Sequence, residues 1–384
     1  MITAKTCARA LLTLVIPGLL LGACKLNGND DDHDKEPALE AKIGQMVMVG
    51  FRGYTVTPQD PIWQDIAERN LGGVVLYDRD VPSNGTVERN IESPDQLKAL
   101  TATLHGIRDN MLLIGIDQEG GLIQRLKPRY GFPESVSHAA LGAADDLDGT
   151  YAAARSIAET LREHGIDINF APVVDVNTNP DNPIIGKLQR SFSGDPAAVT
   201  RHARAYMRAH HDVGVLTTLK HFPGHGSSLD DSHLGVTDVT NTWQPLELEP
   251  YRDLIGAGVV DLVMTAHVFN GNLDADDPAT LSPAVITDLL RGELGFDGVV
   301  ISDDMQMGAI VNYYGFEAAL EKAIHAGVDL LVLSNNGQAY DDGIAARAIA
   351  HIARAVAEGR ISRDRIDQSY RRIQALKLRL ASYR

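Results

Sequence analysis

From Lys42 onward, short apolar runs alternate with longer stretches in which apolar residues recur every three or four positions. The short runs are rich in β-branched residues, as buried strands are, and the longer stretches have the spacing of helices that bury one face. Eight runs have the strand pattern: 46–51, 73–77, 112–116, 166–170, 215–219, 261–265, 298–302 and 329–333.

The stretches between these runs carry helix boundary signals. Three helices are expected to start at a capping residue followed by proline: Asp60-Pro61, Ser93-Pro94 and Ser282-Pro283. Three are expected to end at a glycine directly before the next strand: Gly165, Gly214 and Gly327. Apolar positions within 366–380 predict a last amphipathic helix on the outside of the domain.

Eight repeated strand–helix units predict an α/β fold, a single (β/α)8 barrel of the TIM type. An open, doubly wound parallel sheet is the alternative. The sequence lacks one feature expected of such a sheet, because "IDQEGG" does not match the glycine pattern GxGxxG of a phosphate loop.

The N-terminus has the pattern of a signal peptide, residues 1–23. Lys5 and Arg9 precede an apolar stretch, 10–23, that is too short for a transmembrane helix. The stretch runs into Leu21-Gly22-Ala23-Cys24, which resembles a bacterial lipobox. That resemblance implies cleavage before Cys24 and lipidation of this cysteine. An ordinary secretory signal is the alternative.

Residues 24–38 are predicted to be a flexible tether, because 27–37 is polar, acidic and without periodicity. Lys25 stands where an aspartate would be expected for retention in the inner membrane. We therefore expect a lipid anchor in the bacterial cell envelope, in the outer membrane and facing the periplasm. Residues 39–384 form the remaining domain, since no second linker interrupts them.

The charge of the processed chain limits its partners. Once Lys5 and Arg9 have left with the signal, 33 basic and 51 acidic residues leave a formal charge of −18. This charge argues against nucleic acids and anionic lipid surfaces as partners. Cys7 also leaves with the signal, so no disulfide is expected in the mature chain.

The densest group of titratable residues is Lys220–His233, "KHFPGHGSSLDDSH". Its proline and two glycines predict an irregular loop after the fifth strand. In parallel α/β proteins, loops at the carboxyl ends of strands hold the functional site.

Three interpretations of this loop are open. His221 and His225 are four residues apart, as in the zinc motif HExxH, but Pro223 and Gly224 break the helix that this motif needs. The second interpretation is a set of buried histidines beside a solvated acidic turn. The third is proton transfer, with Asp231 orienting His233 for acid/base work near neutral pH.

Polar residues also follow the other strands. They are Asp117, Glu119 and Arg125 after the third strand, Asp175 and Arg190 after the fourth, His267 after the sixth, and Ser302, Asp303 and Asp304 after the seventh. The carboxyl ends of barrel strands meet at one rim, so these groups predict a site for a polar ligand. Acids and bases there suit glycoside hydrolysis. Asp303 is the candidate nucleophile, and Asp304 is its local competitor.

Four segments resemble the signatures of the glycoside hydrolase family 3 β-N-acetylglucosaminidases, the NagZ-like group, in the same order. They are "IDQEGGLIQR", "RSF", "KHFPGHGSSLDDSH" and "GVVISDDMQMGAI". The resemblance runs from about Leu39 to near the C-terminus. It implies a single catalytic domain, without the second domain that supplies the acid/base in larger β-glucosidases of the family.

The resemblance also implies roles for individual residues. Asp303 matches the nucleophile, His233 the acid/base, and Asp231 the partner of that histidine. The residues matching those that hold the terminal N-acetylglucosamine (GlcNAc) are Asp117, Arg125, Arg190, Lys220 and His221.

The implied activity is that of a β-N-acetylhexosaminidase. It would release non-reducing terminal β-linked GlcNAc with retention, from peptidoglycan fragments or chitooligosaccharides, through a covalent intermediate on Asp303. No cofactor or metal is expected. The alternatives are a β-glucosidase or β-xylosidase, a GlcNAc phosphorylase, and a sugar-binding lipoprotein without turnover.

Overall fold

The structure is a computed structural model that describes residues 37–108, 112–231, 235 and 237–384. Ala38–Arg384 forms one compact unit. Within the described residues, no helix combines the length and apolar character that crossing a membrane requires. The predicted signal peptide, Cys24 and nearly all of the tether lie outside the described residues.

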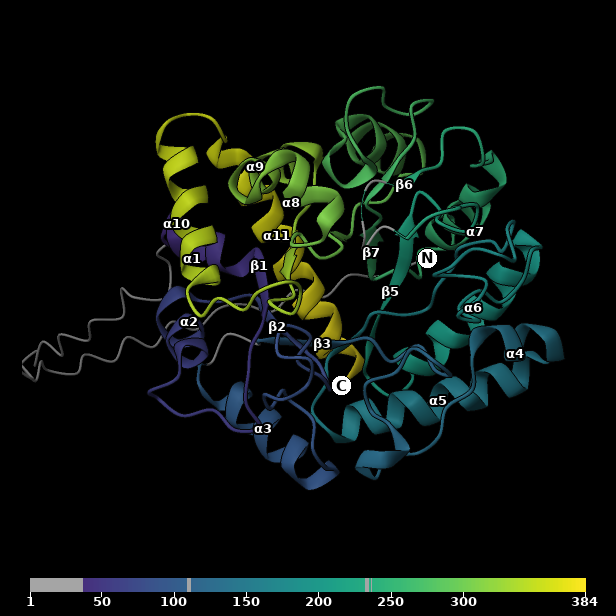
Figure 1. The fold of residues 1–384 in the computed structure, drawn as a ribbon, viewed down its shortest axis with the longest axis horizontal. Coiled ribbons are helices and arrows are strands. Elements are labelled where there is room, and N and C mark those ends of the chain that lie inside the picture. The colour runs from purple at the N-terminus through teal and green to yellow at the C-terminus, as the bar shows by residue number, and fades with distance from the viewer. Residues whose placement is uncertain (1–36, 109–111, 232–234, 236) are drawn as a thin grey trace, which may run out of the picture. The chain divides into compact units, whose positions relative to one another are not determined.

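Eight parallel strands form the centre of this unit (Figure 1). They are β1 (Val47–Gly50), β2 (Gly73–Leu76), β3 (Leu113–Ile116), β4 (Ile168–Asn169), β5 (Leu216–Phe222), β7 (Leu262–Thr265), β9 (Val299–Ile301) and β10 (Leu331–Leu333). Their order is β10-β1-β2-β3-β4-β5-β7-β9. A parallel bridge between Ile301 and Leu330 joins the two outer strands. The sheet therefore closes, which confirms the TIM-type barrel over the open sheet.

Helices surround the strands (Figure 1). They are α1 (Leu39–Gln45), α2 (Pro61–Arg69), α3 (Pro94–Gly106), α4 (His138–Ala144), α5 (Leu147–Glu163), α6 (Pro196–His211), α7 (Glu249–Gly256), α8 (Gly308–Tyr314), α9 (Phe316–Ala326), α10 (Ile344–Ala357) and α11 (Arg363–Tyr383). Shorter or wider turns are η1 (Pro128–Tyr130), η2 (Pro245–Leu248), η3 (Ala279–Leu281) and the π-helix η4 (Ala284–Glu293).

Most of the expected helix boundaries are met, but the element after Ser282-Pro283 is the π-helix η4, which begins at Ala284. The Ser93 hydroxyl accepts a hydrogen bond from Gln96 N–H at 3.3 Å and caps α3 as predicted. Gly165, Gly214 and Gly327 all have positive φ, which suits a residue that ends a helix. Asp60 directly precedes α2 as predicted, but its side chain makes no capping hydrogen bond. Its carboxylate accepts instead from the backbone and hydroxyl of Thr57.

The fifth strand is longer than predicted. It runs to Phe222, so Lys220 and His221 belong to the strand and the irregular loop begins at Pro223. Phe222 is fully buried and packs edge-on against Tyr251, with ring centroids 5.1 Å apart. The side chains of Lys220 and His221 are buried among polar partners, so the strand can continue through these polar residues. A small parallel sheet, β6 (Thr237–Asp238) with β8 (Val268–Phe269), was not predicted.

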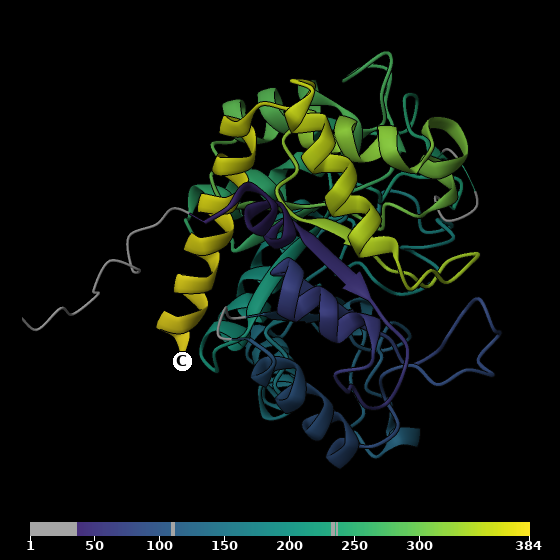
Figure 2. The same cartoon turned by 90° about the vertical axis from the view of Figure 1, so that its left-hand side faces the viewer.

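Buried aspartates mark the amino ends of three barrel strands. Each accepts a hydrogen bond from a backbone N–H of the neighbouring strand: Asp167 from Ile114, Asp261 from Thr217 and Asp329 from Val300. Each is also paired with an arginine of the C-terminal segment: Arg384, Arg379 and Arg365 respectively. Charges at this end therefore hold the barrel to α11, which runs along the left edge of the view in Figure 2.

Candidate active site

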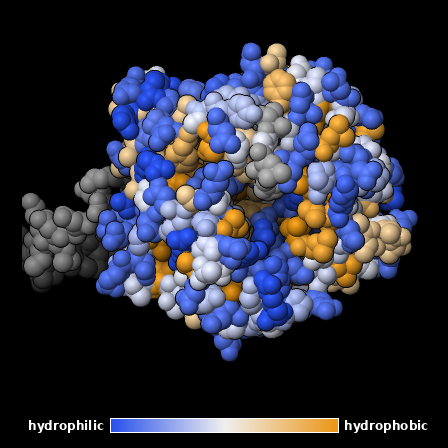
Figure 3. Space-filling view, in the orientation of Figure 1, coloured by the Kyte–Doolittle hydropathy of each residue, from blue (hydrophilic) through white to orange (hydrophobic). Residues whose placement is uncertain are grey.

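A cavity of about 550 Å³ lies at the carboxyl ends of the strands. It is lined by seven of the residues predicted for the site: Asp117, Arg125, Arg190, Lys220, His221, Asp231 and Asp303. His233, the eighth, lies outside the described residues. Apolar side chains, among them Phe170, Met264 and Val332, form part of the wall. Figure 3 shows a face of the molecule that is hollowed near its centre, with hydrophilic and hydrophobic residues around the hollow.

A second cavity, of about 600 Å³, contains none of the predicted residues. It lies beside α11, near the amino ends of β7 and β9. Its arginines include Arg372 and Arg379, which are paired with Asp297 and Asp261. Although this cavity is slightly larger, the concentration of acid/base groups favours the cavity at the carboxyl ends as the candidate active site.

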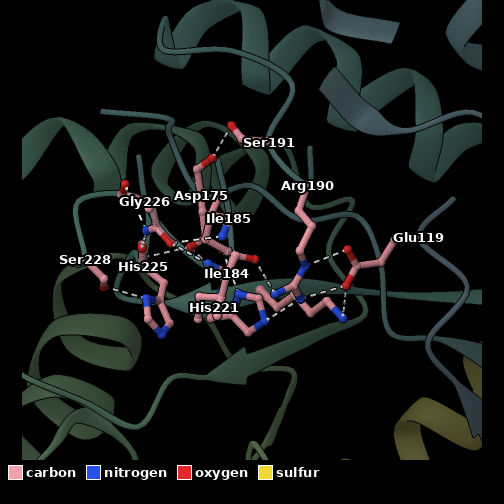
Figure 4. A network of polar contacts seen from close by, with 12 residues as sticks. Glu119, Asp175, Ile184, Ile185, Arg190, Ser191, His221, His225, Gly226 and Ser228 are labelled. Atoms are coloured by element: carbon pink, nitrogen blue, oxygen red, sulfur yellow. Dashed lines mark hydrogen bonds and ion pairs between the residues drawn. The ribbon is translucent and has the colours of Figure 1, made fainter. Parts of the chain in front are cut away.

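A continuous chain of ion pairs forms one side of the active-site cavity. The Lys220 ammonium lies 2.8 Å from Asp117 Oδ1 and 2.6 Å from Glu119 Oε1. Arg190 binds Glu119 with two parallel hydrogen bonds of 2.9 and 2.8 Å (Figure 4). Arg125 Nη2 lies 3.2 Å from Asp117 Oδ2. These contacts come from β3, from β5 and from the loop after β4, so the barrel itself sets their geometry.

The electrostatics of this chain keep its carboxylates ionised. Burial alone would raise the pKa of Asp117, but the cations of Lys220 and Arg125 outweigh burial and lower it to about 2. Glu119 is likewise buried, and Arg190 and Lys220 hold its pKa well below its usual range. Asp117 therefore presents a fixed hydrogen-bond acceptor to a ligand at any ordinary pH.

The hydrogen bonds of His221 fix its tautomer. Arg190 Nη2 lies 3.1 Å from His221 Nε2, and a guanidinium can only donate, so Nε2 accepts. His221 Nδ1 must then carry the proton and donate to Asp175 Oδ2, 2.7 Å away (Figure 4). Both ring nitrogens are thus engaged by protein groups.

The metal interpretation of the loop gains no support from the geometry. His225 Nδ1 lies 2.5 Å from the Ser228 hydroxyl, and the rings of His221 and His225 meet edge-on, 5.9 Å apart. In the part of the chain that the structure describes, no three His, Cys, Asp or Glu side chains form a metal-binding group.

The two adjacent aspartates after β9 have different surroundings, although both line the cavity. The Asp304 carboxylate accepts from Ser334 N–H at 2.9 Å, from the Ser334 hydroxyl at 2.5 Å and from Gln306 N–H at 3.1 Å. Asp303 Oδ1 accepts from the N–H of Asp304 at 2.8 Å. The Asp304 carboxylate is committed to holding the loop after β10, which favours Asp303 as the reacting group.

His267 supports this end of the site and does not line the cavity. It is buried, and its Nε2 lies 2.9 Å from the carbonyl oxygen of Asp304, so it helps to hold the chain beside Asp303.

Sequence reasoning missed several residues of the cavity. Tyr77, Asp78 and Lys127 line it, and the Lys127 ammonium lies 2.6 Å from Asp78 Oδ2. Tyr77 and Asp78 directly follow β2, so the rule used for the other strand ends could have found them. Asn336, after β10, could have been found in the same way.

The comparisons with known proteins agree with this arrangement. Residues 38–376 match the glycosyl hydrolase family 3 N-terminal domain. A β-hexosaminidase of Tolumonas auensis is 38% identical over 273 residues, covering 69% of this chain and 76% of the relative. A β-hexosaminidase of Stenotrophomonas maltophilia is 37% identical over 295 residues, covering 75% of this chain and 83% of the relative.

Two solved structures are also similar. One is a glycoside hydrolase family 3 β-N-acetylglucosaminidase from Paenibacillus, with 41% identity and a TM-score of 0.82 over 90% of this chain. This chain spans only 63% of that protein's chain. The other is a β-N-acetylhexosaminidase from Beutenbergia cavernae, with 30% identity and a TM-score of 0.78, covering 89% of this chain and 99% of the other. The chain therefore belongs to glycoside hydrolase family 3.

Proposed function

We propose that this chain is a retaining exo-β-N-acetylglucosaminidase that removes non-reducing terminal GlcNAc from peptidoglycan fragments or chitooligosaccharides. The observation that carries the proposal is the presence of Asp303 and Asp231 in one cavity with the cluster of Asp117, Arg125, Lys220 and Arg190. The curated relatives, named β-hexosaminidases, support the same reaction.

In the first half of the reaction, the Asp303 carboxylate attacks C1 of the sugar and the glycosidic C–O bond breaks. His233, charged and oriented by Asp231, gives its proton to the departing oxygen. The result is a glycosyl ester on Asp303, and a second inversion at C1 restores the β-configuration. In that second half, a water gives its proton to His233 and its oxygen to C1, and the bond between C1 and the Asp303 carboxylate breaks.

The polar cluster supplies the recognition of the sugar. Asp117 is ionised and its two oxygens are held by Lys220 and Arg125, so a sugar hydroxyl can donate to a carboxylate that does not move. A preorganised set of this kind binds polyols at little cost in side-chain entropy.

The test of this proposal is turnover of nitrophenyl glycosides by residues 38–384. We expect β-GlcNAc to be cleaved, and the β-glucoside and β-xyloside to be cleaved much more slowly. NMR should show the β-anomer of GlcNAc as the first product, in the presence or absence of phosphate. A β-glucoside preference, GlcNAc 1-phosphate as product, or binding without turnover would each favour one of the alternatives.

We also propose that the chain is anchored in the outer membrane by lipid on Cys24, because Leu21–Cys24 resembles a lipobox. Cells expressing the full chain with labelled palmitate should yield a labelled protein in the membrane fraction. Cys24→Ser should remove the label. A labelled Cys24→Ser protein, or unlabelled wild type, would contradict the anchor.

A further inference from the structure

The loop that begins at Pro223 is held at its start by a buried carboxyl group, that of Glu247 in η2. Glu247 is fully buried. Its Oε2 accepts a hydrogen bond from Gly226 N–H at 3.0 Å, and its Oε1 lies 3.4 Å from Gln244 N–H. The carboxyl group therefore joins the loop to the turn that starts α7. Neither the sequence motifs nor the cavity lining includes this residue.

The packing of residues 223–226 leaves little room for this segment to lie elsewhere. Gly224 has a φ of +122°, and a Cβ there would lie 2.7 Å from both Cβ and Oε2 of Glu247. A Cβ on Gly226 would lie 1.8 Å from the carbonyl oxygen of Val176. Residues 223–226 are thus confined between the Glu247 side chain and the backbone after β4, and the two glycines permit this close approach.

Further contacts fix residues 223–226. Trp243, four positions before Glu247, donates from Nε1 to the Pro223 carbonyl at 3.1 Å. From the other side, Asn182 Nδ2 donates to the carbonyl of His225 at 2.7 Å. Removal of Glu247 would leave the buried N–H of Gly226 without this acceptor, at a cost in free energy.

We propose that Glu247 is a positioning residue for proton transfer to the leaving group. It fixes the start of the loop that continues to Asp231, which lines the cavity, and through that loop it sets the position of the carboxylate that orients the proposed proton donor. The inference rests on the proposed function. It concerns only the step that needs the acid, not the attack of Asp303 or the binding of the sugar.

A pair of substrates separates this role from a general structural one. The dinitrophenolate of dinitrophenyl β-GlcNAc leaves without protonation, whereas the sugar oxygen of chitobiose needs a proton. For Glu247→Ala we expect kcat/KM for chitobiose to fall roughly 10²-fold, in the range that acid catalysis contributes. The value for dinitrophenyl β-GlcNAc should fall less than about tenfold.

Milder variants provide an internal series. Glu247→Gln keeps an oxygen that can accept from Gly226 N–H and should restore most of the chitobiose activity. Burial raises the pKa of Glu247 to about 7, so the neutral glutamine also imitates the protonated form present below that pH. Trp243→Phe, which removes the bond to Pro223 and keeps an aromatic ring, should show the same selectivity as Glu247→Ala, but to a smaller degree.

Asp167→Asn is the matched control, because Asp167 is also a buried carboxylate that accepts a backbone N–H, at the opposite end of the barrel. It should lower the melting temperature and leave the ratio of the two kcat/KM values unchanged. Equal losses on both substrates in Glu247→Ala and Trp243→Phe would overturn the positioning role. Wild-type protein inactive on both substrates would instead overturn the proposed function.

Discussion

Replacing Asp303 with alanine is expected to lower kcat/KM for nitrophenyl β-GlcNAc by about 10³-fold or more, because the step that forms the glycosyl ester then has no nucleophile. The carboxylate stands directly after β9, where the barrel fixes its position, and it lines the cavity. Steady-state kinetics on the two proteins measures the loss. A loss smaller than about tenfold would show that another group attacks C1.

Azide distinguishes a lost nucleophile from a lost fold. It can occupy the space of the missing carboxylate in Asp303→Ala, attack C1 once and leave the α-glycosyl azide. We expect azide to restore part of the turnover with an activated substrate. A β-glycosyl azide would indicate two inversions, and therefore that the nucleophile is still present and Asp303 has another role.

Replacing Glu119 with alanine is expected to destabilise the fold by about 3–5 kcal/mol, the usual cost of removing one partner of a buried ion pair. Glu119 is 1% exposed, and its carboxylate forms ion pairs with both Arg190 and Lys220. Without it, Arg190 loses its carboxylate partner, and Lys220 keeps only Asp117, which also binds Arg125. Denaturant unfolding measures the free energy, and sugar affinity should fall as well because Arg190 and Lys220 lose their fixed positions.

The Arg155–Glu159 pair on α5 is the control, since both of its side chains are exposed. Glu159→Ala should change the free energy of unfolding very little, because exposed pairs contribute little. Similar effects of Glu119→Ala and Glu159→Ala would mean that the cluster around Lys220 does not stabilise the barrel.

The same cluster sets a pH window for stability. The pKa of Asp117 and that of Glu119 are lower in the folded protein than in the unfolded chain. Their contribution is therefore complete above the unfolded values, about pH 4–4.5. It is lost as the pH falls toward the folded values, about 2 for Asp117. The difference in stability between wild type and Glu119→Ala should shrink over that range.

The barrel was predictable because its signals are local. A β-branched run and a glycine before the next strand depend on neighbours in the chain, and all eight predicted runs overlap an observed barrel strand. The end of β5 was not predictable in this way. Lys220 and His221 have the composition of loop residues, and the sequence does not show that their partners are Asp117 and Asp175, which are distant along the chain.

The same distinction between local and distant signals applies to the candidate site. Seven residues predicted at or after the carboxyl ends of the strands do line one cavity. Their positions after the strands could not assign them roles, which stay predictions, as do the roles of His233 and Cys24. Glu247 carried no signal at all. Its importance comes from a 3.0 Å contact with Gly226, 21 residues earlier, and from the close packing of Gly224.

The most direct test of the account is to find where the sugar becomes attached. A 5-fluoro β-GlcNAc fluoride slows hydrolysis of a glycosyl ester, so brief incubation, acid quench and peptide mass spectrometry should reveal the intermediate. We predict one sugar on the peptide that contains the end of β9, with fragmentation placing it on Asp303. Attachment to Asp304 or Asp231, or turnover without any adduct, would contradict the assignment of the nucleophile.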